Sequence, residues 1–195
     1  NPPQVREGGL KVRDLRVLTH EGAVVVDNVN FDVQPGEVLA IAGVQGNGQT
    51  ELVEAIVGLA EKASGSIDLG GVELLGKSVR GVLDEGVGFV PEDRKEDGLV
   101  GSFSVAENLI LDRSSDPEFV VAGTIKRGAL EQFARDRIAE YDIRTQSFET
   151  PAGTLSGGNQ QKVVIARELS RDLRLFVAAQ PTRGVDVGSI EFIHK

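Results

Sequence analysis

The sequence predicts an α/β fold in which a β-rich beginning is followed by a helical middle and a second α/β segment. Two observations predict it. The apolar residues 38–42 lead into a glycine-rich loop and then into apolar residues at helical spacing, which is a strand–loop–helix order. A second apolar run, residues 173–179, indicates another buried strand near the end of the chain.

The remaining elements follow from periodicity and turn residues. Alternating apolar residues predict strands within residues 10–33, and Gly70-Gly71 predicts a hairpin turn within residues 65–76. Residues 87–90 form a short apolar run that ends at Pro91, and the pattern becomes helical from Ser104 onward. One helical face is apolar, and Glu131 and Arg135 stand four residues apart on another; the apolar face comprises Leu130, Phe133, Ala134, Ile138 and Tyr141.

Composition restricts the class of protein. The 195 residues suffice for one domain with a hydrophobic core, and no repeat or linker marks a second. The 30 acidic and 21 basic residues give a net charge of −9, which argues against nucleic acid as the main partner. The absence of cysteine excludes disulfides and thiolate metal sites. No apolar run approaches the about eighteen residues of a membrane span, and the chain begins with Asn1 rather than Met. We therefore expect a piece of a longer cytoplasmic protein, or of the cytoplasmic part of a membrane complex.

The loop of residues 43–50 has the frame of a phosphate-binding loop. Its glycines permit backbone N–H groups to approach an anion closely, and the helix that follows directs its N-terminus at the same anion. Thr50 stands where a Mg²⁺ ligand is expected, but Gln49 stands where the pattern has Lys. A neutral amide offsets no phosphate charge, so we expect weaker binding. A glycine turn without a ligand is the alternative. The candidate phosphate-binding residues are Gly43, Gly46, Asn47, Gly48, Gln49 and Thr50.

A second glycine-containing segment, residues 155–162, also precedes a helix. Ser156 is a good N-cap, and Gly157 and Gly158 leave backbone N–H groups bare at the helix start. A capped helix after a turn is the structural alternative to an anion-binding surface.

Three motifs in this order resemble the ATPase domains of ABC transporters over nearly the whole chain. They are the loop 43–50, the octet 155–162, which resembles the signature motif, and residues 180–186, which resemble the Walker B and D-loop region. Residues 91–94, 159–162 and 178–184 look like the C-terminal half of tandem ATPase subunits from simple-sugar and nucleoside importers. The Ala178-Ala179-Gln180 sequence is most similar to the nucleoside branch, which is paired with basic-membrane-protein binding lipoproteins.

The resemblance implies a P-loop NTPase fold of the ABC type. It comprises an N-terminal antiparallel β subdomain, a RecA-like parallel core and a helical insertion, and the C-terminal part of the core is missing from this chain. We expect a single nucleotide-binding domain over residues 1–195. Residues 10–92 are its β subdomain and phosphate-loop core, residues 93–165 its helical subdomain with the signature, and residues 166–195 a core strand and the D-loop.

Four positions depart from a working ABC site. Ala179 replaces the Asp that holds Mg²⁺, and Gln180 replaces the Glu that polarises the attacking water. Gln49 replaces the Lys, and Glu92 replaces the glutamine that senses Mg²⁺ and phosphate; its carboxylate is a conceivable substitute metal ligand. We therefore expect no catalytic residue in this domain, and weak Mg²⁺ binding at Thr50.

ABC domains pair head to tail, so each domain's signature faces the ATP of its partner. The intact signature residues would serve the partner's ATP, whereas this domain's own site would hold ATP and hydrolyse it poorly. The resemblance gives nucleotide contacts to Ser156, Gly157, Gly158, Gln160, Glu92 and the D-loop Asp186. A carboxylate near a helix N-cap is the structural alternative for Asp186.

The two histidines of the chain lie near positions that contact nucleotide in the family, but neither fits such a role. His20, with Thr19 and Leu18, lies near where the family carries an aromatic residue that stacks on adenine, and no aromatic side chain is present there. His194 follows Asp186 too soon to be the family's phosphate-contacting histidine.

The implied partners are the N-terminal nucleotide-binding domain of the same subunit, transmembrane permease subunits and, indirectly, a substrate-binding lipoprotein, at the cytoplasmic face of the plasma membrane. Phe103 and Phe119 are candidates for exposed docking residues. A catalytically silent ABC-fold module that binds nucleotide or protein is one rival. An ABC protein that acts on nucleic acid or ribosomes is another, and the acidic balance counts against it.

Overall fold

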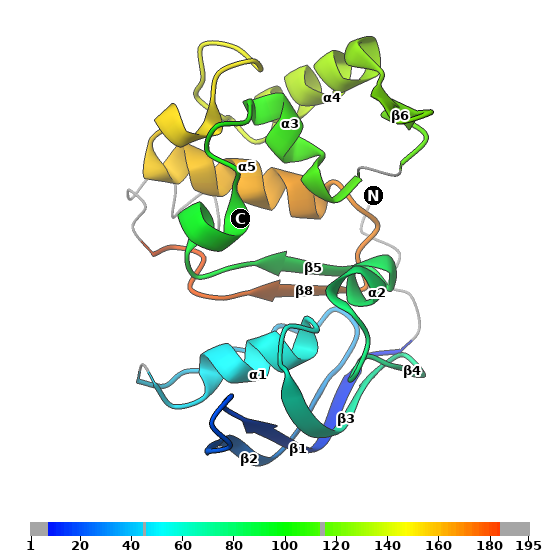
Figure 1. Cartoon of the computed structure of the whole chain (residues 1–195), viewed down its shortest axis with the longest axis vertical. Helices are drawn as coiled ribbons and strands as arrows, with labels where there is room; N and C mark the ends of the chain where they lie inside the picture. The colour runs from blue at the N-terminus through cyan, green and yellow to red at the C-terminus, as the bar shows by residue number, and fades with distance from the viewer. Residues whose placement is uncertain (1–7, 45, 114–115, 184–195) are drawn as a thin grey trace. The chain divides into compact units, whose positions relative to one another are not determined.

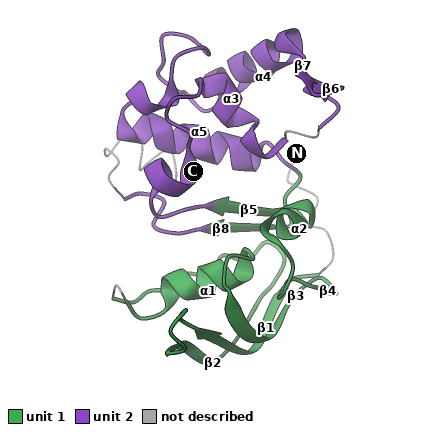
Figure 2. Cartoon of the chain, viewed as in Figure 1, with its two compact units in different colours: residues 1–89, 172–177 green, residues 90–171, 178–195 purple. Residues whose placement is uncertain are grey.

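The computed structural model describes residues 8–44, 46–113 and 116–183 (Figure 1). The chain divides into two compact units, which Figure 2 shows in different colours. Unit 1 comprises residues 1–89 and 172–177, and unit 2 comprises residues 90–171 and 178–195.

Unit 1 is built on a four-stranded antiparallel sheet in the order β2-β1-β3-β4. The strands are β1 (Leu10–Leu18), β2 (Val24–Val33), β3 (Lys62–Leu69) and β4 (Val72–Glu73). The predicted hairpin turn joins β3 to β4, since Gly70 and Gly71 both adopt positive φ, at 58° and 86°. This turn geometry favours glycine because a Cβ is strained there.

One face of this sheet is covered by the helix that follows the glycine-rich loop. Helix α1 (Gln49–Ile56) buries Leu52, Ala55 and Ile56 in the same cluster as Val12 and Val17 of β1. Helix α2 (Val79–Asp84) is capped by Ser78, whose side chain accepts from Gly81 N–H, and it contributes the buried Val82. The apolar positions at helical spacing after residue 48 thus form a helix, as the sequence predicts.

The segment before the loop differs from the prediction. Residues 38–42 are not a strand, and within the described part of the chain no strand pairs with them. Val38 is 92% exposed, and Leu39 and Ile41 are also exposed. An apolar run becomes a buried strand only when neighbouring strands satisfy its backbone and cover its side chains. The prediction of a buried strand here was therefore wrong.

A two-stranded sheet pairs β5 (Val87–Val90) with β8 (Leu175–Ala178). The short apolar run of residues 87–90 that ends at Pro91 is thus a strand. Strand β8 is shorter than the predicted 173–179 and alternates between half-buried and exposed residues. The expectation of full burial was wrong, because a strand that is covered on one face alternates instead.

Unit 2 is mainly helical. Its α-helices are α3 (Val105–Leu109), α4 (Arg127–Glu140) and α5 (Gly157–Leu169), and its core holds side chains from all three. Shorter elements are the π-helix η1 (Arg94–Gly98), the 3₁₀ helices η2 (Leu111–Arg113) and η3 (Ala152–Thr154), and the hairpin of β6 (Val120–Val121) and β7 (Thr124–Ile125). Within the described ranges, no helix is long and apolar enough to cross a membrane.

The predicted face of α4 is confirmed. Leu130, Ala134 and Tyr141 are buried, Phe133 and Ile138 pack against the core, and Glu131 pairs with Arg135 at 2.8 Å. Phe103 and Phe119 were both expected to be exposed, but they pack differently. Phe103 is 43% exposed, but Phe119 is fully buried against Phe133 at a ring-centroid distance of 4.9 Å. The guanidinium of Arg113 covers Phe119 at 4.4 Å, so that prediction of exposure was wrong.

Candidate functional site

The glycine-rich loop of unit 1 leads directly into α1. Gly46 and Gly48 adopt φ of 89° and 86°, a region that favours glycine. Gly48 is the residue before the helix, and a Cβ added there would lie 2.5 Å from the carbonyl oxygen of Val25. The glycine at this position is therefore required by the packing of the loop against β2, whether or not an anion binds.

The Gln49 side chain folds back over this loop. In the amide orientation that satisfies both of its polar atoms, its oxygen accepts from Gly43 N–H at 3.0 Å and its nitrogen donates to Val44 O at 3.2 Å. A phosphate in a loop of this kind is bound by backbone N–H groups. Gln49 thus occupies one backbone N–H group of the loop, and it brings no positive charge. Thr50 is exposed at the second position of α1, and Asn47 is exposed within the loop.

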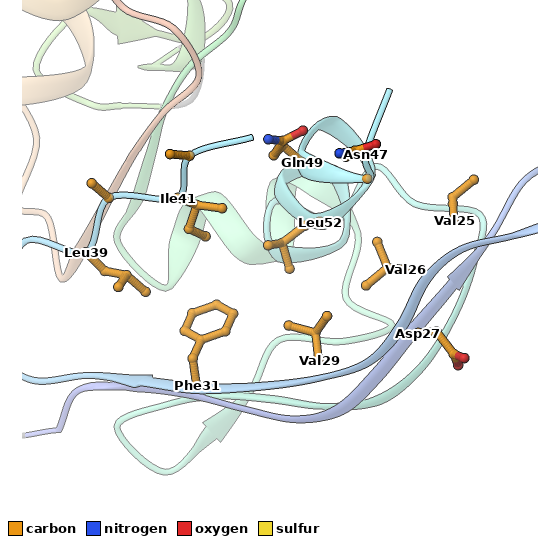
Figure 3. A pocket seen from close by; sticks show the side chains of 13 residues that line it. Val25, Val26, Asp27, Val29, Phe31, Leu39, Ile41, Asn47, Gln49 and Leu52 are labelled. Atoms are coloured by element: carbon orange, nitrogen blue, oxygen red, sulfur yellow. The ribbon is translucent and has the colours of Figure 1, made fainter. Parts of the chain in front are cut away.

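A cavity of about 520 Å³ lies beneath the loop (Figure 3). Asn47 and Gln49 stand at one end of it, and Phe31 and Val29 of β2 point into it from the side opposite α1. Apart from Asn47, Gln49 and Asp27, the side chains that line it are apolar. Apolar walls offer no ligands to phosphate or Mg²⁺. The cavity therefore adds nothing to the anion-binding capacity of the loop.

The start of α5 in unit 2 presents the second candidate surface. Ser156 occupies the N-cap position with extended φ and ψ, as predicted, and its side chain is exposed. In the described structure, however, this side chain makes no capping hydrogen bond to the first turn. The sequence-based prediction of a side-chain cap was wrong at this point. A helix start that lacks such a cap keeps backbone N–H groups available to an anion.

The Ser156 hydroxyl has another partner. The Asn159 amide nitrogen donates to Ser156 Oγ at 2.9 Å, and the Asn159 amide oxygen accepts from Arg144 N–H at 2.8 Å. Gln160, in contrast, is only 3% exposed and donates to the carbonyl oxygens of Ala152 and Gly153 at 3.4 and 3.3 Å. The structure therefore places Gln160 inside unit 2, where it supports η3.

Helix α5 is held in unit 2 by charged side chains on its buried faces. Lys162, with a side chain 7% exposed, donates to the carbonyl oxygen and the carboxylate of Asp142 at 2.7 and 3.0 Å. Arg167 donates to Gly98 O at 2.8 Å, and Arg171, just after the helix, pairs with Asp112 at 2.8 Å. Buried charges need such partners, because an isolated one is strongly destabilising. These contacts are spread along α5, so they hold the whole helix, including its N-terminus, in place within unit 2.

The loop after β5 carries Glu92, and the turn after β8 carries Arg183. The two side chains form an ion pair, and Arg94 donates to the carbonyl oxygen of Arg183 at 2.9 Å. Asp93 caps η1 by accepting from the N–H groups of Lys95 and Glu96 at 2.9 and 3.3 Å, and these bonds hold its pKa below the ordinary value. In this arrangement the Glu92 carboxylate faces a guanidinium.

The turn after β8 contains Ala179 and Gln180, the two positions that are predicted to differ from the Walker B residues of a hydrolytic site. Ala179 N–H donates to Val90 O at 2.9 Å, and Arg183 N–H donates to Gln180 O at 2.9 Å. Gln180 adopts φ of 46°, in the left-handed region. A methyl group at Ala179 cannot ligate a metal, and a neutral amide at Gln180 is not a general base.

These residues do not fit a tightly held Mg²⁺. Among the residues that the structure describes, no three His, Cys, Asp or Glu side chains gather where they could hold a metal ion. Thr50 offers one hydroxyl oxygen, and Mg²⁺ in proteins is usually bound by one or two carboxylates as well as by substrate phosphates. Two further predicted positions, Asp186 and His194, lie outside the described residues. His20 is exposed in the turn after β1 and contacts Glu61 at 3.1 Å.

Comparison with known proteins decides the family. Residues 26–183 match the ABC transporter family. The chain belongs to this family. It is 43% identical over 187 residues to the guanosine import ATP-binding protein NupO of Bacillus subtilis, which covers 96% of this chain and 36% of that protein. It is 42% identical over 192 residues to the nucleoside import ATP-binding protein NupA of Lactococcus lactis, covering 98% of this chain and 38% of that protein.

Sugar importers are also among the similar members of the ABC transporter family. The ribose import ATP-binding protein RbsA of Oceanobacillus iheyensis is 40% identical over 169 residues, which is 87% of this chain and 34% of that protein. The chain therefore spans little more than a third of the length of the curated relatives that it matches. The resemblance to the nucleoside branch that the sequence motifs indicated is confirmed.

Solved structures of ABC ATPases confirm the fold. A dimeric ATP-binding cassette in a post-hydrolysis state with ADP and Pi superposes with a TM-score of 0.75 at 20% identity, covering 94% of this chain and 79% of that chain. A bacterial Atm1-family ABC exporter with ATP bound gives a TM-score of 0.73 at 20% identity, covering 97% of this chain and 32% of that chain. The predicted α/β P-loop NTPase fold of the ABC type is thus correct.

Proposed function

We propose that this chain is the second nucleotide-binding domain of a tandem ABC importer ATPase, and that it contributes its signature motif to an ATP site completed by the first domain. Residues 1–195 act as one domain, with residues 10–92, 93–165 and 166–195 as its β subdomain and phosphate-loop core, its signature-bearing helical subdomain, and its core strand and D-loop. This chain covers only 36% and 38% of the two nucleoside-import relatives, which is consistent with such a tandem arrangement.

The observation that carries this proposal is the contrast between the two candidate surfaces. At the start of α5, the exposed Ser156 hydroxyl and a helix start without a side-chain cap are available to a ligand. At the phosphate loop of the same chain, the Gln49 amide lies against Gly43, and in the orientation that satisfies both of its polar atoms it hydrogen-bonds to Gly43 and Val44. The domain therefore offers a good surface to a partner's ATP and keeps a poor site for its own.

Its own site holds ATP weakly and hydrolyses it slowly. ABC ATPases in general bind ATP with Mg²⁺, but Ala179 supplies no metal ligand and Gln180 no base. Loss of the general base alone costs about a hundredfold or more in rate. Bound nucleotide at this site stabilises the closed pair of domains, while the partner's ATP is hydrolysed against Ser156, Gly157 and Gly158.

The transported substrate is a nucleoside, because the two relatives with the highest identity given above are named for guanosine and nucleoside import; a simple sugar is the alternative that the ribose relative suggests. The partners are permease subunits in the plasma membrane, with a binding lipoprotein that delivers substrate. The chain then acts at the cytoplasmic face of that membrane.

The test is ATP hydrolysis by the full-length subunit with single changes in this domain. Gly157→Asp places a carboxylate at the first residue of α5, where it repels phosphate, and we expect turnover to fall by about a hundredfold. Gln180→Glu restores one missing group and should raise turnover less than about twofold, since general-base catalysis also requires a positioned metal and water. Gly128→Asp is the matched control, because it puts the same charge in the first turn of α4, where a Cβ has open space.

If Gly157→Asp leaves turnover unchanged, signature donation is wrong. The chain would then be a catalytically silent module that binds nucleotide or protein. The occupation of the phosphate loop by Gln49 is the observation that favours this second function.

A further inference from the structure

The signature residue Asn159 makes two hydrogen bonds that together fix the orientation of its side-chain amide. Its oxygen accepts from Arg144 N–H at 2.8 Å, so the amide nitrogen must face the other way, and it donates to Ser156 Oγ at 2.9 Å. An amide with an N–H donor on one side can satisfy both of its ends in one orientation only.

The Arg144 backbone that sets this orientation is itself held by α5. Lys162 donates to the carbonyl oxygen and the carboxylate of Asp142, two residues before Arg144. Lys162 and Asn159 are three residues apart and therefore lie on the same face of the helix. The two side chains fasten the segment 142–144 to α5, and the amide of Asn159 is thus positioned from both ends.

This arrangement determines where the Ser156 proton goes. A serine hydroxyl has one proton to donate and lone pairs that accept. The Asn159 amide donates a hydrogen bond to the hydroxyl oxygen, so the proton of the hydroxyl group points to another acceptor. In the described structure the Ser156 side chain caps no N–H group of α5, and Ser156 is exposed. The hydroxyl is therefore oriented as a donor toward solvent, at the mouth of the helix start.

We propose that Asn159 is a positioning residue that orients the Ser156 hydroxyl to donate its proton to a phosphate oxygen of the ATP held by the partner domain. The proposal rests on the proposed function, because it presumes that this signature meets the partner's ATP. Asn159 itself touches no phosphate. Its contribution passes entirely through Ser156, which distinguishes it from a residue that only stabilises the helix.

The isosteric variant Asn159→Asp tests the proposal in the full-length subunit. The carboxylate still accepts from Arg144 N–H, but its second oxygen replaces the amide donor and draws the Ser156 proton inward. We expect ATP turnover to fall by about tenfold or more, as for the loss of a hydrogen bond to a charged group. The thermal midpoint should be unchanged or higher, since an acidic residue in the first turn of a helix is stabilising.

A charge effect is separated from an orientation effect by a double-mutant cycle with Ser156→Ala. If Asn159 acts through the hydroxyl, Asn159→Asp lowers turnover in the wild type and has no further effect in the Ser156→Ala background. Gln146→Glu is the matched control, because it makes the same amide-to-carboxylate change at an exposed position near Arg144. It should leave turnover unchanged.

The failures are distinguishable. If Asn159→Asp lowers turnover by the same factor in both backgrounds, the added charge is responsible and the positioning role is wrong. If Ser156→Ala lowers turnover but Asn159→Asp does not, the positioning role is wrong and signature donation stands. If neither Ser156→Ala nor Gly157→Asp changes turnover, the proposed function fails and the positioning role fails with it.

Discussion

The Glu92 carboxylate forms an ion pair with the Arg183 guanidinium, 91 residues later in the chain. The pair joins the loop after β5 to the turn after β8, and Arg94 reinforces it by donating to the carbonyl oxygen of Arg183. These loops carry Glu92 and Gln180, two of the four positions at which the sequence analysis expects a departure from a hydrolytic ABC site. An internal ion pair thus joins two loops that carry residues predicted to belong to the nucleotide site.

We expect a coupling of about 0.5 kcal/mol between Glu92 and Arg183, because one side chain is more than half exposed and such pairs are weak. A double-mutant cycle with Glu92→Gln and Arg183→Gln, measured by urea unfolding, gives this value. The coupling should shrink at 1 M salt, where screening is strong. A coupling that does not respond to salt would contradict an ionic contact.

Gln49→Lys should tighten ATP binding by about five- to tenfold. A charged donor makes a stronger hydrogen bond to phosphate than a neutral amide does, and the change also releases Gly43 N–H. A titration of the chain with a fluorescent ATP analogue measures the effect. Gln49→Leu releases the same N–H group without adding charge, so an equal gain from this variant would show that the charge is unimportant.

The capping box of α3 should contribute about 1 kcal/mol of stability. The Ser104 hydroxyl accepts from Glu107 N–H. The Glu107 carboxylate accepts from Ser104 N–H at 2.8 Å and from the Ser104 hydroxyl at 2.7 Å, and these two bonds lower the Glu107 pKa. Ser104→Ala should therefore destabilise the protein by that amount in chemical unfolding and raise the Glu107 pKa. Ser102→Ala, two residues away at an exposed position, should change neither quantity.

The hydrogen bond from Lys162 and the charge of Lys162 hold the Asp142 pKa below its ordinary value of 3.8. The stability that this contact contributes is therefore present above about pH 4 and is lost as the pH falls through the lowered pKa. Lys162→Met, which keeps an apolar chain of similar length, should raise the Asp142 pKa toward its ordinary value, as carboxyl carbon NMR shifts would measure. The stability difference between wild type and variant should narrow in acid, and in an Asp142→Asn background it should not change with pH between 2 and 5. A pKa that does not rise in the variant would contradict the assignment.

Much of the fold was predictable because local periodicity and turn chemistry agree with the tertiary structure. The glycine pair that joins β3 to β4 and the apolar face of α4 are examples. The segment 38–42 was not predictable in this way, since burial of an apolar run depends on neighbouring strands and not on the run itself. Phe119 was expected at the surface because nothing in its local sequence reveals that Phe133 and Arg113 cover it.

The candidate site was predictable in its positions but not in its contacts. The sequence locates Gln49, Ser156 and Glu92, because each lies within a motif of fixed spacing. It does not reveal that Gln49 turns back onto Gly43, or that Glu92 meets Arg183, since these contacts depend on side-chain orientation and on residues distant in the chain. The two hydrogen bonds of Asn159 were not predicted. The proximity of Asn159 to Ser156, three residues earlier and thus one helical turn away, was the available signal.

The contact between Gly48 and Val25 has a consequence for tracing the history of such loops. A Cβ at Gly48 would meet the Val25 carbonyl oxygen at 2.5 Å, so folding alone retains this glycine. A descendant of this gene that abandoned ATP altogether would lose the amide and hydroxyl side chains of the loop long before it lost Gly48. Glycine spacing therefore indicates common ancestry, and a genome search that relies on it would also return loops that no longer bind ATP.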